Sequence, residues 1–115
     1  MAFAKIVIKI KRIAMIIIGH ELVAFKRPKI CDFSKQSLEQ KSQFILIKNE
    51  IQAVIANANG INFLACESLE LAKSLQELAN DYLFDSKIAL LISNDDDLLK
   101  AITARIDAVI YKNIL

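Results

Sequence analysis

The residues best suited to chemistry are an asparagine and three consecutive aspartates at positions 94–97, directly after an apolar run. Adjacent carboxylates at a strand end can hold Mg²⁺, which uses one or two protein carboxylates and completes its shell with water or phosphate. On this interpretation Asn94, Asp95 and Asp97 bind a ligand, and Asp95 is the metal ligand. The same residues also suit a helix start, with Asn94 as the N-cap and the aspartates complementing the helix dipole. We favour the helix start, because it explains every residue without a ligand.

A second candidate is the basic run Lys26, Arg27 and Lys29, which surrounds Pro28. These side chains are candidates for binding an anion such as a small phosphate compound. Short charge runs usually lie in solvated loops, and a solvated loop is the simpler interpretation here.

Other reactive residues do not form a recognisable set. The two glycines, Gly19 and Gly60, exclude the glycine-rich phosphate loops of dinucleotide and P-loop sites. His20 is predicted to lie in a turn, without the positioned partner that a general base needs. Cys66 ends an apolar run and is predicted to be a buried, inert thiol, and no role is assigned to Cys31. We therefore predict no catalytic residue and no resident cofactor, with magnesium as the only option left open.

The elements that position these residues follow from hydrophobic periodicity. From residue 44 the chain alternates apolar runs with amphipathic runs, which predicts a βαβαβαβ series over residues 44–113. Expected strands cover residues 44–47, 61–66, 88–92 and 106–111. Strands that are apolar on both faces and separated by helices predict a mainly parallel sheet, and hence the α/β class.

The intervening helices have clear start signals. Asn49, Ser68 and Asn94 are the expected N-caps, and Gly60 ends the first of these helices. Helical spacing predicts the buried faces. In the first helix they comprise Ile51, Val54, Ile55 and Ala58; in the second, Leu71, Leu75, Leu78 and Tyr82; in the third, Leu98, Leu99 and Ile102.

The first 43 residues follow a different pattern. Isoleucine and lysine alternate over residues 5–11, as in a half-buried strand. Residues 16–18 and 22–25 flank Gly19 and His20, and a Gly-X pair between two such runs predicts an antiparallel β-hairpin. We expect one domain over residues 1–115, with a hairpin region and connector in residues 1–43 and the βαβ series in residues 44–115.

Composition narrows the possible functions. The 115 residues are 55% apolar and 24% charged, which is typical of a globular protein. No apolar stretch near the start reaches the roughly twenty residues of a membrane helix, and the cysteines suggest neither disulfides nor zinc, so we expect a cytoplasmic protein with no membrane association. Residues 1–48 carry ten Lys or Arg and three acids, whereas residues 49–115 carry five and ten. Nucleic-acid binding through the basic half is disfavoured, because no aromatic residues are interleaved with the basic ones.

Residues 60–113 resemble part of the thiamin phosphate synthase family of β/α barrels. That family pairs an amphipathic helix with an apolar strand ending in Asn-Asp, followed by a helix and a strand that begins with Asp. The matching stretches here are residues 71–79, 90–95 and 107–110.

The resemblance implies a β/α architecture and a magnesium-dependent reaction of a phosphate ester or diphosphate, with Asn94 and Asp95 as the substrate and magnesium residues. Ala108 and Ile110 stand where the family has glycine and histidine, and residues 62–66 lack its polar diphosphate-binding residues. A shared architecture does not require shared chemistry.

Taken together, these patterns favour a non-catalytic domain that binds a protein or a small ligand. The alternatives are the magnesium-dependent phosphate enzyme and, after it, a nucleic-acid-binding protein. We also expect a homo-oligomer, most simply a homodimer, because open strand edges favour pairing with a second copy.

Overall fold

The computed structural model describes residues 14–115 and contains one six-stranded sheet flanked by helices. Every strand pair in the sheet is parallel, in the order β1-β6-β5-β4-β3-β2. The strands are β1 (Ile16–Ile18), β2 (Ile30–Asp32), β3 (Phe44–Leu46), β4 (Phe63–Cys66), β5 (Lys87–Ile92) and β6 (Ala108–Tyr111). The predicted α/β class and parallel sheet are confirmed.

The helices begin where the sequence predicts. Asn49, Ser68 and Asn94 each accept a hydrogen bond from a backbone N–H in the first turn of their helix. Ser34 caps a further short helix in the connector. The helical elements are α2 (Lys35–Glu39), α3 (Glu50–Ala58), α4 (Leu69–Asp81), α5 (Asp95–Thr103) and the 3₁₀ turn η1 (Lys112–Ile114).

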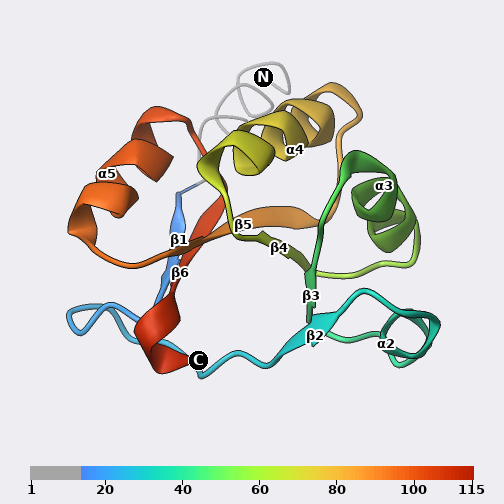
Figure 1. Cartoon of the computed structure of the whole chain (residues 1–115), viewed down its shortest axis with the longest axis horizontal. Helices are drawn as coiled ribbons and strands as arrows, with labels where there is room; N and C mark the ends of the chain where they lie inside the picture. The colour runs from blue at the N-terminus through green and yellow to red at the C-terminus, as the bar shows by residue number, and fades with distance from the viewer. Residues whose placement is uncertain (1–13) are drawn as a thin grey trace, which may run out of the picture.

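The strand order gives the sheet the topology of an open barrel. From β2 to β6 each strand lies beside its predecessor, so right-handed crossovers place every helix on the same face. Figure 1 shows the resulting arc, with α2 to α5 around its outer side. The last strand, β6, pairs with the first, β1, as in a β/α barrel. The barrel is open because β1 and β2 are not hydrogen-bonded to each other. Residues 19–29 cross this break between β1 and β2 (Figure 1).

Alternate strand residues form two apolar layers. The outer layer, between the sheet and the helices, includes Leu64, Ile88 and Val109. The inner layer fills the concave face with side chains from all six strands. Among residues 14–115, no helix covers the concave side.

The predicted antiparallel hairpin is wrong within the described residues. Ile16–Ile18 forms β1 but pairs in parallel with β6, and residues 22–25 are not a strand. Gly19 (φ +102°) lies so close to Tyr111 and Ile114 that a Cβ atom would contact both at 2.9 Å. A turn stabilised by the Val23 N–H bond to the His20 carbonyl then directs the chain across the break rather than back along β1. The strand expected at residues 5–11 lies outside the described residues.

The predicted buried face of the α3 helix is also wrong. Ile51, Val54 and Ile55 are 72%, 46% and 40% exposed, and α3 contacts the core through Ala53 and Ala56 instead. Small alanine side chains let the helix approach the sheet closely, which turns the larger residues outward.

Two other predicted helix faces are corrected in part. Leu75 of α4 is buried, but Tyr82 is 74% exposed just beyond the end of that helix. In α5, Leu98 packs against the core, whereas Leu99 and Ile102 are exposed.

Between residues 14 and 115, no helix has the length and apolar character needed to span a bilayer.

Candidate functional site

Two pockets bring together the candidate residues. The first, the carboxyl-end pocket, has a volume of about 500 Å³ and lies where β1, β5 and β6 end. Ligands of parallel α/β proteins bind at this edge of the sheet. The pocket is lined by Gly19, His20, Glu21, Ser93, Asn94, Asp95, Asp96, Tyr111 and Asn113.

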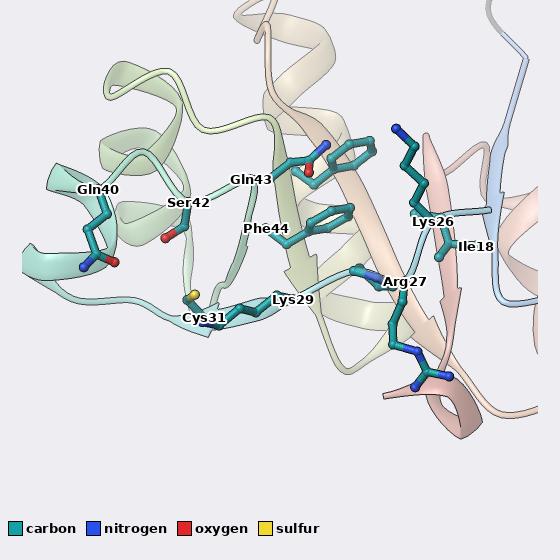
Figure 2. A pocket seen from close by; sticks show the side chains of 11 residues that line it. Ile18, Lys26, Arg27, Lys29, Cys31, Gln40, Ser42, Gln43 and Phe44 are labelled. Atoms are coloured by element: carbon teal, nitrogen blue, oxygen red, sulfur yellow. The ribbon is translucent and has the colours of Figure 1, made fainter.

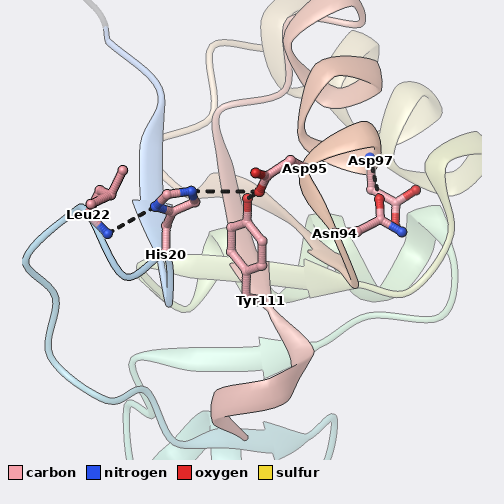
Figure 3. A network of polar contacts seen from close by, with 6 residues as sticks. All are labelled: His20, Leu22, Asn94, Asp95, Asp97 and Tyr111. Atoms are coloured by element: carbon pink, nitrogen blue, oxygen red, sulfur yellow. Dashed lines mark hydrogen bonds and ion pairs between the residues drawn. The ribbon is translucent and has the colours of Figure 1, made fainter.

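Three side chains in the carboxyl-end pocket contact one another. The Tyr111 hydroxyl donates to Asp95 Oδ1 at 2.7 Å, and His20 Nε2 lies 3.6 Å from the same oxygen (Figure 3). The Leu22 N–H donates to His20 Nδ1 at 3.0 Å. A neutral His20 therefore carries its proton on Nε2, directed at Asp95. The Nδ1 lone pair is thus occupied as an acceptor, and Nε2 lies near the Asp95 carboxylate at a distance longer than a hydrogen bond.

Burial and the neighbouring carboxylate keep Tyr111 protonated. The residue is 6% exposed, and burial, the hydrogen bond to Asp95 and the negative charge of Asp95 raise the pKa of Tyr111 to about 12. At neutral pH it is a hydrogen-bond donor to Asp95.

The acidic run serves mainly as a helix start. Asn94 Oδ1 accepts the Asp97 N–H at 2.9 Å, and Asp97 Oδ2 accepts the Ser93 N–H at 3.1 Å. Of the three residues predicted to bind a ligand, Asn94 and Asp97 are thus engaged in capping, and Asp95 is the one joined to His20 and Tyr111. Within residues 14–115, no group of three or more His, Cys, Asp or Glu side chains is placed to hold a metal ion.

Cys66 is buried at the end of β4, as predicted. Its burial, together with the charge of Glu67, raises the pKa of the thiol to about 12. Such a thiol is inert at neutral pH.

The second pocket, which we call the basic pocket, lies at the break between β1 and β2 and has a volume of about 470 Å³. It gathers all three predicted anion-binding residues, Lys26, Arg27 and Lys29, and within residues 14–115 no acidic residue lines it. Its remaining lining residues are Ile18, Pro28, Cys31, Gln40, Ser42, Gln43, Phe44 and Phe63.

The walls of the basic pocket differ in character. Phe44 and Phe63 are paired across β3 and β4, and their rings stack with centroids 4.5 Å apart and 9° between planes. Figure 2 shows Lys26 across the pocket from Phe44 and Gln43. Arg27 points away from Phe44 in the same view, and its Nη1 donates to the Ile114 carbonyl at 2.6 Å. Among residues 14–115, Lys26 and Lys29 have no hydrogen-bond or ion-pair partner, whereas Arg27 anchors the crossing segment to η1.

Sequence reasoning missed the residues that complete each pocket. Tyr111 and His20 are distant from Asp95 in the chain, and Phe63 is distant from Lys26, so no local spacing connects them. The three cations were found because they are adjacent in sequence.

No protein-family model matches the sequence, and no curated protein matches it significantly.

Proposed function

We propose that this chain is a non-catalytic binding domain that takes a small anion in the basic pocket. The observation that carries the proposal is the gathering of three cationic side chains around a pocket of about 470 Å³, with no acidic side chain among the described residues of its lining. Small-molecule sites in proteins have volumes of about 300–1,000 Å³ and combine apolar walls with a few polar groups. The Phe pair and the side chains of Gln40, Ser42 and Gln43 provide this combination.

The lining chemistry favours binding over catalysis. Cys31 and Ser42 are potential nucleophiles, but among residues 14–115 neither a histidine nor a carboxylate lines the pocket to serve as their base. We therefore assign the pocket to holding a ligand unchanged.

The test is calorimetric titration of the full chain with acetate, benzoate and inorganic phosphate at low ionic strength. We expect Lys26→Ala and Lys29→Ala each to weaken binding about two- to fivefold, because both cations are solvent-exposed and their pairing with an anion is screened. Added salt weakens binding for the same reason. Lys73→Ala, on the exposed side of α4, is the matched control and leaves the affinity unchanged.

Alkylation of Cys31 gives a second readout at the same pocket. A bound anion slows the reaction of Cys31 with iodoacetamide, while buried Cys66 stays unreacted with or without the anion. The proposal is refuted if none of the three anions binds at low ionic strength, or if binding is indifferent to both lysine substitutions.

We further propose that two copies of the chain associate as a homodimer. The support is the exposed apolar face of α3, formed by Ile51, Val54 and Ile55. Three large apolar side chains on one helix face favour burial against a partner.

A further inference from the structure

We propose that the ligand of the basic pocket is a small aromatic carboxylate. This inference rests on the proposed function, since it names the class of anion that the same pocket holds. It joins two features of the lining: a stacked pair of phenyl rings on one side and the Lys26 side chain on the other.

The phenyl pair forms a preorganised wall for a flat ring. Phe44 is 5% exposed and is held by the core, whereas Phe63 is only half-buried. Parallel stacking on Phe44 fixes the plane of the Phe63 ring, so that a ligand ring meets an aromatic surface of defined orientation. Aromatic pairs prefer offset-stacked or edge-to-face contacts and gain affinity beyond the area that they bury. A ring is therefore favoured over an aliphatic group of the same size.

The polar side of the pocket suits one carboxylate. Lys26 faces the phenyl wall across the pocket, and Gln43 lies beside that wall (Figure 2). Both are side-chain donors, and Gln43 is neutral, so the charge that faces the phenyl wall is the single positive charge of Lys26. A carboxylate matches it with one negative charge, in a charge-assisted hydrogen bond to the ammonium group.

The experiment compares five probes on the full chain by calorimetry: benzoate, cyclohexanecarboxylate, acetate, phenyl phosphate and benzyl alcohol. We expect benzoate to bind about two- to tenfold more tightly than cyclohexanecarboxylate, which has the same charge and a similar size but no aromatic ring. Acetate keeps the carboxylate but lacks the ring, and benzyl alcohol keeps the ring but lacks the charge. Both are expected to bind more weakly than benzoate.

Two variants test whether the preference for an aromatic ring comes from Phe63. Phe63→Leu removes the preference for benzoate over cyclohexanecarboxylate and leaves acetate binding unchanged. Phe84→Leu, which alters a phenylalanine packed against the outer core layer, is the control and keeps the preference. If Phe63→Leu fails to fold, the comparison of probes on the unmodified chain still decides the question.

The outcomes separate the two proposals. Equal binding of benzoate and cyclohexanecarboxylate, with Lys26→Ala weakening both, overturns the aromatic inference and leaves the proposed function standing. Tighter binding of phenyl phosphate than of benzoate overturns the carboxylate assignment. Failure of every anionic probe to bind at low ionic strength overturns both proposals.

Discussion

Individual residues of the carboxyl-end pocket connect parts of the fold that local sequence does not join. Asp95 begins α5, His20 follows β1 and Tyr111 ends β6, and the three meet at one carboxylate oxygen. Tyr111 is buried apart from this contact, so its hydroxyl depends on Asp95 for a partner. The pair therefore fastens β6 to the start of α5.

We predict that Tyr111→Phe lowers the free energy of unfolding at neutral pH by about 0.5–1.5 kcal/mol, the net contribution of one hydrogen bond. The substitution also changes how the free energy of unfolding depends on pH. The pKa of Tyr111 is about 12 in the folded state against 10.0 ordinarily, so the unfolded chain releases the phenolic proton first. The resulting stabilisation is complete below pH 10 and is lost as the pH rises towards 12.

Thermal denaturation measured from pH 9 to pH 12 tests this prediction. The Tm of the unmodified protein is expected to fall more steeply above pH 10 than that of Tyr111→Phe. Tyr82→Phe is the matched control, because Tyr82 is 74% exposed, and it should keep the steep decline. If Tm falls equally steeply with pH in the unmodified protein and in Tyr111→Phe, Tyr111 is not responsible for the loss of stability above pH 10.

At the scale of elements, the helix starts are specified locally. Asn94 and Asp97 satisfy two backbone N–H groups at the beginning of α5, as the sequence predicts for a cap. Local sequence does not specify which face of each helix is exposed. Ile51 and Leu99 fit an amphipathic pattern, yet both are exposed, because packing against the curved sheet selects the alanines of α3 and α5.

We predict that Asn94→Ala destabilises the protein by about 1 kcal/mol, because the Asp97 N–H loses its acceptor. Urea denaturation at neutral pH measures the change. Asp96→Asn is the control, since Asp96 is exposed in the first turn, and its substitution changes stability by about 0.5 kcal/mol or less. A loss as large for Asp96→Asn as for Asn94→Ala would assign the effect to charge at the helix start rather than to the cap.

For the whole molecule, the open barrel explains the basic pocket, and the packing of α3 on the sheet explains the exposed apolar surface. The break between β1 and β2 leaves room for the pocket, and the crossing segment carries lysines to its rim. On the outer side, α3 presents Ile51, Val54 and Ile55 to solvent. Pairing of α3 with its counterpart in a second copy would bury these side chains by a symmetric interface.

We predict that light scattering coupled to size exclusion gives the mass of a dimer at high protein concentration. Ile51→Lys is expected to raise the dissociation constant about tenfold or more, since it replaces a buried apolar contact by a charge at the interface. Leu83→Lys alters a residue that is 86% exposed beyond α4 and serves as the control, with no change in mass. A monomeric mass for the unmodified chain at all concentrations would contradict the homodimer.

The order of helices and strands over residues 44–113, the three N-caps and the burial of Cys66 were accessible from the sequence, because capping and strand patterning depend on residues only a few positions apart. The grouping of Lys26, Arg27 and Lys29 was accessible for the same reason.

Tertiary structure alone decided what the acidic strand end contacts. The sequence placed Asn94, Asp95 and Asp97 at a helix start, but only the pairing of β1 with β6 brings His20 and Tyr111 to Asp95. The same pairing replaced the expected hairpin, and the break between β1 and β2 left room for the basic pocket, whose lining includes both Lys26 and Phe63. Hydrogen bonding between strands far apart in the chain depends on the curvature and register of the whole sheet, and no local pattern specifies either.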